Sequence, residues 1–165
     1  MKKVARQLFI SIFARRADYK TTSDMKIDEG FSVEISSGYD RLWKYNLAVT
    51  CGCFGSSGEG GSEDERLDFV AAEAFVAPVG SNLKSCPADY PADRAIRFTT
   101  VPCDYLKMYV YVIPHTLPEE RDVADCKPFG LRVRVLRGKA AIHDEEHSVN
   151  CWSGASIELR LPKEQ

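Results

Sequence analysis

The last third of the chain alternates apolar and polar residues with a period of two. Three segments show this pattern: Tyr105–Ile113, Leu131–Leu136 and Ile157–Leu161. Successive side chains of a β-strand point to opposite faces of its sheet, so this period indicates half-buried strands. It predicts little helix in this region, because the apolar face of a helix repeats every three or four residues.

Other stretches of the chain carry the same alternation or are apolar on both faces. They are Val4–Ala14, Phe31–Ile35, Leu42–Cys51, Ala95–Val101 and Ala140–Trp152. About seven to nine strands, separated by turn residues and without alternating helices, are typical of two antiparallel sheets packed face to face. The sequence therefore predicts an all-β chain folded as an antiparallel two-sheet β-sandwich.

Residues 63–76 fit two interpretations equally well. Ser62 and Glu65 have the spacing of a helix capping box, and the apolar residues that follow have helical spacing, which predicts one short helix. With a period of two, the same residues form a strand that pairs with Leu42–Cys51 as a hairpin. The connection between them, Gly52–Glu65, is rich in Gly, Ser and acidic residues, and we expect it to be a mobile loop.

Length and charge limit the domain count and the partners. A chain of 165 residues fits a single domain, residues 1–165, that buries ~70% of its unfolded surface. The net charge of −2 leaves no basic excess for phosphate, so we expect no nucleic-acid partner. No stretch approaches the ~20 apolar residues of a transmembrane helix. Arg15 and Arg16 stand where a signal peptide needs small residues, so with Met1 as the natural start we expect a cytoplasmic protein.

The cysteines favour free thiols over a disulfide framework. There are six: Cys51, Cys53, Cys86, Cys103, Cys126 and Cys151. They are too sparse for a small disulfide scaffold, and no export signal is recognisable, so we expect most of them to be reduced. Cys51 and Cys53 share one face of a strand, where we expect them to pack in the core.

The stretch His143-Asp144-Glu145-Glu146-His147 resembles the zinc motif H-x-x-E-H of the inverzincin metallopeptidases, over these five residues. The resemblance implies that His143 and His147 bind zinc and that Glu146 acts as general base. That chemistry needs a helix, on which residues four apart share a face. Here the surrounding pattern predicts a strand or hairpin, which moves residues 143 and 147 about 13 Å apart. We therefore expect no metal site, and a zinc-dependent hydrolase is kept as an alternative.

Acidic residues in the predicted loops suggest a second alternative. They are Glu59, Glu63, Asp64, Glu65, Asp89 and Asp93. Calcium takes six to eight oxygen ligands, so a sandwich with acidic loops at one end could bind calcium as C2 domains do. The likeness to C2 domains is one of fold alone, and we expect these acids to be solvated loop residues.

Aromatic residues on one predicted strand suggest a binding surface. Tyr109 and Tyr111 share a face with Lys107 and lie opposite Met108 and Val110. If that face is open to solvent, it is suited to protein binding rather than to catalysis. We therefore expect a non-enzymatic binding or assembly module that contacts another macromolecule, most readily a protein, and that needs no cofactor.

Overall fold

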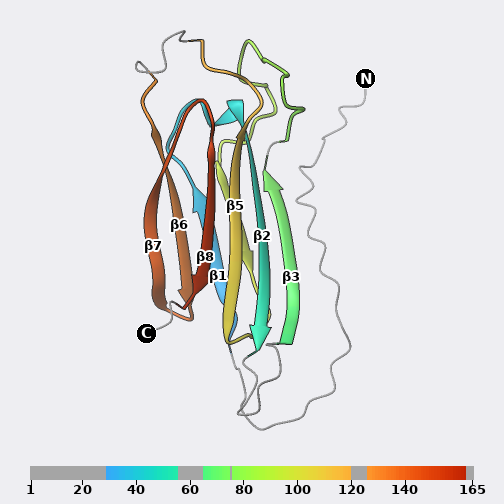
Figure 1. Cartoon of the computed structure of the whole chain (residues 1–165), viewed down its shortest axis with the longest axis vertical. Helices are drawn as coiled ribbons and strands as arrows, with labels where there is room; N and C mark the ends of the chain where they lie inside the picture. The colour runs from blue at the N-terminus through green and yellow to red at the C-terminus, as the bar shows by residue number, and fades with distance from the viewer. Residues whose placement is uncertain (1–28, 56–64, 75, 120–125, 163–165) are drawn as a thin grey trace.

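The computed structural model describes residues 29–55, 65–74, 76–119 and 126–162, which form eight β-strands and one 3₁₀ turn (Figure 1). The predicted all-β, antiparallel two-sheet sandwich is confirmed. Within the described residues, no helix is long or apolar enough to cross a bilayer. The elements in chain order are β1 (Phe31–Ser36), η1 (Leu42–Lys44), β2 (Tyr45–Gly55), β3 (Glu65–Ala74), β4 (Ala95–Thr99), β5 (Tyr105–Pro114), β6 (Phe129–Arg137), β7 (Ala140–Val149) and β8 (Ala155–Leu161).

Each sheet has four strands and every pairing is antiparallel. The first sheet has the order β4-β1-β6-β7 and the second has the order β3-β2-β5-β8. The two sheets approach each other at both sides, where β3 lies near β4 and β7 lies near β8. This places the central strands of one sheet over those of the other, as in a face-to-face sandwich (Figure 1).

The core fills the space between the two sheets. On β6, Val133 and Val135 point inward, and on β5 Met108 and Val110 do the same, and all four are fully buried. Their neighbours along each strand point outward, as the period-two pattern predicted. Inward residues of β1 and β2 complete the core: Phe31, Val33, Ile35, Leu47, Val49, Cys51 and Cys53.

Residues 65–74, the described part of that range below residue 75, are not helical, and the short-helix alternative is wrong there. Residues Glu65–Ala74 form β3, which pairs with β2 from Leu47↔Ala74 to Gly55↔Glu65. Val70 and Ala72 are buried while Phe69 is exposed, so the period-two interpretation was the right one. The local helix preference of the capping box is outweighed, because as a strand the segment forms a ladder of hydrogen bonds with β2 and buries one face in the core.

Several boundaries differ from those predicted. Strand β2 begins after the 3₁₀ turn η1 and runs on to Gly55, into the stretch predicted as a loop; residues 56–64 of that stretch lie outside the described residues. Strand β7 ends at Val149 rather than at Trp152. The turn that follows needs Gly154, which has a φ of +74° and where a Cβ would collide with the carbonyl oxygen of Val112. The predicted strand Val4–Ala14 also lies outside the described residues.

Two of the six cysteines are joined. Cys126 and Cys151 form a disulfide, with Cα atoms 6.3 Å apart, and the other four are free. Cys53 and Cys103 are fully buried in the core. A hydrogen bond with Cys103 lowers the pKa of Cys53, but the contact with Cys51 and the burial outweigh it and raise that pKa to about 12. The pKa of Cys103 is raised as well, chiefly by its hydrogen bond with Cys53, so both thiols are protonated at neutral pH and unreactive.

Replacing Leu106 by Ala should lower the free energy of unfolding by about 2–5 kcal/mol, because it opens a cavity in a fully buried site. Ile113→Ala is the matched control, since Ile113 lies on the same strand with 42% of its surface exposed. The control should cost about 0.5 kcal/mol or less. Urea unfolding followed by circular dichroism measures both, and equal losses would contradict the assigned faces of β5.

Counting thiols under denaturing, non-reducing conditions should give four per chain, and six after reduction. In the folded protein Cys86 should react first, because it is the exposed one. Reduction should also destabilise the protein by about 3 kcal/mol, because it restores the conformational freedom that the disulfide removes from the unfolded chain. The closed loop is set by the 25-residue separation of Cys126 and Cys151. A count of six without reductant would show that the disulfide is absent.

Candidate functional site

An inward-facing group of polar side chains lies on β7, at the edge of the first sheet. Pairing with β6 sets His143 opposite Val135, Glu145 opposite Val133 and His147 opposite Leu131. All three partners are fully buried in the core. Because directly paired residues of antiparallel strands share a face, His143, Glu145 and His147 face the space between the sheets.

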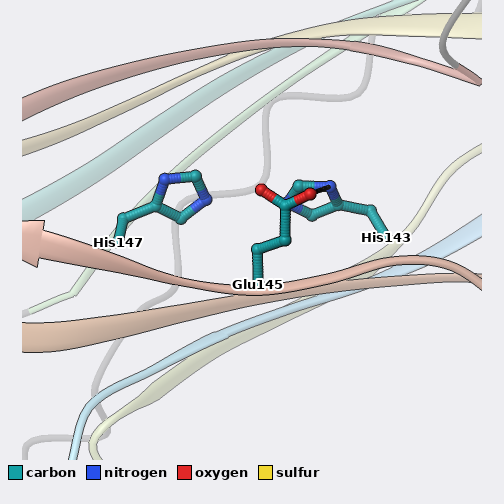
Figure 2. Close-up of side chains that lie close together, drawn as sticks. All are labelled: His143, Glu145 and His147. Atoms are coloured by element: carbon teal, nitrogen blue, oxygen red, sulfur yellow. Dashed lines mark ion pairs between the residues drawn. The ribbon is translucent and has the colours of Figure 1, made fainter.

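The three side chains converge on one another, as Figure 2 shows. Their ligating atoms all lie within 4.8 Å of one another. The two imidazole rings have centroids 5.8 Å apart, and Nδ1 of His143 lies 3.7 Å from Oε1 of Glu145. The His143 side chain is 1% exposed and that of Glu145 is 51% exposed. The group therefore extends from the buried interior to the solvent.

This convergence was missed by the argument from strand spacing. The spacing of about 13 Å applies to backbone atoms four residues apart. The rings of His143 and His147 lean toward each other and toward the carboxylate of Glu145, which closes most of that distance (Figure 2). The usable pattern in the sequence is H-x-E-x-H read with a period of two, rather than H-x-x-E-H read as a helix.

Glu146 does not belong to this group. It pairs with Arg132, and its carboxylate lies over Gly130, where a Cβ would collide with it. Glu146 is therefore on the outer face of the first sheet, away from both imidazoles. The general-base role that the inverzincin resemblance implied for Glu146 has no geometric support, because the stretch is a strand and Glu145 takes the place beside the histidines.

The outer face of the first sheet is covered by paired charges. Arg132 donates two hydrogen bonds to the carboxylate of Asp144, at 2.6 and 2.8 Å. Arg134 adds a third contact at 3.6 Å. The hydrogen bond from Arg132 holds the pKa of Asp144 below its usual value, against an opposing effect of desolvation. Nearby, Arg97 makes ion pairs with Glu34 and with Asp93.

The outer face of the second sheet has a different character, because it carries exposed aromatic and aliphatic side chains. We call it the aromatic face and define it by Phe69, Lys107, Tyr109, Tyr111 and Ile113. Phe69 is 41% exposed, Tyr111 36% and Ile113 42%. Tyr109 and Lys107 are partly exposed on the same face of β5. The face of Lys107, Tyr109 and Tyr111 is therefore open to solvent, which is the condition under which the sequence suggested a binding surface.

Cations and aromatic rings stack at one end of this face. The Lys107 ammonium lies 5.2 Å from the ring centre of Phe54 and 5.9 Å from that of Tyr105. Arg160 lies 4.5 Å above the ring of Tyr105. The Phe54 ring lies over Gly52, where a Cβ would approach it to 2.8 Å. These stacked groups fix one another's positions by cation–π contacts.

Tyr109 is held in place in the middle of the aromatic face. Its hydroxyl donates a 3.0 Å hydrogen bond to Oε1 of Glu158, which lies opposite it on β8. This hydrogen bond, followed by the charge of Glu158, raises the pKa of Tyr109. On its other side Tyr109 lies opposite Thr50 of β2. The ring therefore stands between its hydrogen-bond partner on β8 and a small residue on β2.

The acidic loop residues that the structure describes do not come together in a group of three ligating side chains. Asp93 is paired with Arg97, and neither Asp89 nor Asp93 belongs to such a group in the described part of the chain. Glu65 is the first residue of β3 and is exposed. Glu59, Glu63 and Asp64 lie outside the described residues.

Comparisons with known proteins give no family for this chain. No family model matches it, and no curated protein matches it. One solved structure that it resembles is a DUF4425 family protein from Bacteroides ovatus ATCC 8483. The two are 10% identical, the match covers 81% of this chain and 93% of that chain, and the TM-score is 0.33. A likeness at this level carries no argument about function.

Replacing Asp144 by Asn should reduce the dependence of the free energy of unfolding on pH in the acid range. The pKa of Asp144 is lower in the folded protein than its usual value of 3.8. Its contribution is therefore fully present above pH 3.8 and is lost as the pH falls through the lower, folded value. Urea unfolding at a series of acid pH values measures this, with Glu146→Gln as control. An unchanged slope in Asp144→Asn would contradict the pairing with Arg132.

Proposed function

We propose that this chain is a non-enzymatic β-sandwich module that binds another protein through its aromatic face. The observation that carries the proposal is the contrast between the two outer faces. In the first sheet, Arg132 pairs with Asp144 and Arg97 with Glu34. In the second, Phe69, Tyr111 and Ile113 are each more than one third exposed. A face that needed only solubility would resemble the first one.

The composition of the aromatic face favours a protein partner. Protein interfaces are enriched in Tyr, Phe and other large apolar side chains at their centres, with charged residues at the rim. Tyr111 and Ile113 are neighbours on the outer face of β5. The charged Lys107 lies nearer the start of the same strand, to one side of this apolar pair. Tyr and Trp also dominate the residues whose removal costs most binding energy.

The rigidity of the aromatic face supports the proposal further. Binding is weakened by the entropy lost when interface side chains become ordered. Tyr109 is already fixed by Glu158, and Lys107 by the rings of Phe54 and Tyr105. These side chains lose little further freedom when a partner covers them.

The rival functions have less support. A hydrolase on the inverzincin pattern requires Glu146 beside the histidines, and Glu146 faces the other side of β7. The absence of a nucleic-acid partner stays a prediction from the net charge of −2. The cytoplasmic location also stays a prediction, and the disulfide between Cys126 and Cys151 weighs against it, because disulfides are rare in reducing compartments.

A photo-cross-linking phenylalanine analogue placed at Tyr111 should trap the partner in cells that make the protein naturally. We expect one discrete adduct, because the side chain at this position is 36% exposed in the middle of the proposed interface. The same analogue at Glu34, on the outer face of the first sheet, is the matched control and should give no discrete adduct. Gel electrophoresis and mass spectrometry of the adduct measure the result.

The same experiment repeated with Tyr109→Ala tests the interface itself. Removing this ring should weaken the interaction by about 2 kcal/mol, the usual scale for a central aromatic residue, and so reduce the adduct at position 111 strongly. Equal labelling from positions 111 and 34, or an adduct that Tyr109→Ala leaves unchanged, would contradict the proposal. Circular dichroism of each variant confirms that the sandwich is intact.

A further inference from the structure

We propose that His143, Glu145 and His147 bind one divalent transition-metal ion, zinc in preference to the others, at the β7 edge of the sandwich. The three residues occupy positions 143, 145 and 147 of one strand, so the period of two places them on one face. Their ligating atoms lie within 4.8 Å of one another. This site is independent of the aromatic face, which lies on the other sheet.

The distances are close to those of a coordinated ion. Zinc binds imidazole nitrogen and carboxylate oxygen at about 2.0–2.2 Å, so two ligands of a tetrahedral ion are roughly 3.4 Å apart. Nδ1 of His143 and Oε1 of Glu145 are already 3.7 Å apart. The widest pair needs to close by about 1.4 Å from 4.8 Å to reach the tetrahedral spacing. Rotations of Glu145 and His147 achieve this, since neither side chain is fully buried.

The donor set selects the class of metal. Two imidazoles and one carboxylate suit zinc and the neighbouring transition metals, whereas calcium and magnesium require oxygen ligands almost exclusively. Zinc imposes no preferred geometry of its own and is bound in many proteins by three side chains with water in the fourth position. The half-exposed Glu145 carboxylate lies on the solvent side of the group, where a water ligand can enter.

A buried ring nitrogen of His147 that lacks a hydrogen-bond partner among the described residues supports the proposal of a bound metal. This atom is Nε2, and it is shielded from solvent. A buried polar atom left without a partner costs about 1–3 kcal/mol. A metal ion bound to this imidazole would remove that cost, and Glu145 would balance part of its charge.

Protection of the sheet edge explains less of the arrangement. Inward-pointing polar residues on an edge strand discourage pairing with another chain. That role requires polar side chains on β7, but it does not require two imidazoles to lean toward each other and toward one carboxylate, as they do in Figure 2. Metal binding requires this convergence.

Zinc titration of the full chain, without a polyhistidine tag and after chelator treatment, tests the proposal. Isothermal titration calorimetry at neutral pH should give one zinc per chain and a higher melting temperature with zinc than with chelator. His147→Ala and Glu145→Gln should each weaken binding by about tenfold or more. Glu146→Gln is the matched control, because it changes the neighbouring carboxylate on the opposite face, and it should bind zinc as the parent protein does.

The three histidines provide a second readout by nuclear magnetic resonance. Zinc should shift the imidazole signals of His143 and His147 and leave His115 unchanged, since His115 is buried and bonded to the carbonyl of Trp43 and to Thr116. Binding should weaken as the pH is lowered, because metal and protons compete for the imidazole nitrogens. No stoichiometric binding by the folded protein, or binding unchanged in both His147→Ala and Glu145→Gln, would overturn the proposal. Neither result bears on the proposal that the aromatic face binds a protein.

Discussion

The packing of the two inner sheet faces against each other is the constraint on which the rest of the structure depends. Residues such as Val133 on β6 and Val110 on β5 are fully buried between the sheets. Burial of apolar surface in such residues stabilises the fold by roughly 25 cal/mol per Å². Because strand side chains alternate, this inner face determines which residues every strand presents outward. The two outer faces are therefore consequences of the core and cannot shift independently of it.

Strand β5 shows how the core and the proposed interface are coupled. Met108 and Val110 are buried, so Tyr109 and Tyr111 between and after them must point outward. A slip of one residue in register would bury the tyrosines and expose the core, so the register is strongly specified. Pairing with β2 and β8 on both sides keeps β5 rigid. Most of the aromatic face is thus presented by a central strand of its sheet.

Strand β7 has a different position and tolerates different residues. As an edge strand it is paired on one side by β6, and its inner face lies near β8 at the margin of the core. Polar side chains fit there because part of the group, Glu145, reaches solvent. On the outer side, the double hydrogen bond between Arg132 and Asp144 ties β7 to β6. That pair holds in place the strand from which the two histidines project.

The sequence by itself determined the strands with clear alternation and that Tyr109 and Tyr111 share the face opposite Met108 and Val110, because these follow from local periodicity. Whether that face is open to solvent was decided by the packing of the two sheets. The sequence could not decide between helix and strand for β3, since local propensity supported both and the hydrogen bonds to β2 settled the matter. The H-x-x-E-H resemblance implied Glu146 beside the histidines, the strand spacing implied no metal site, and neither pointed to Glu145. Which carboxylate joins His143 and His147 depends on the pairing of β7 with β6 and on how the rings lean, and only the tertiary structure fixes both.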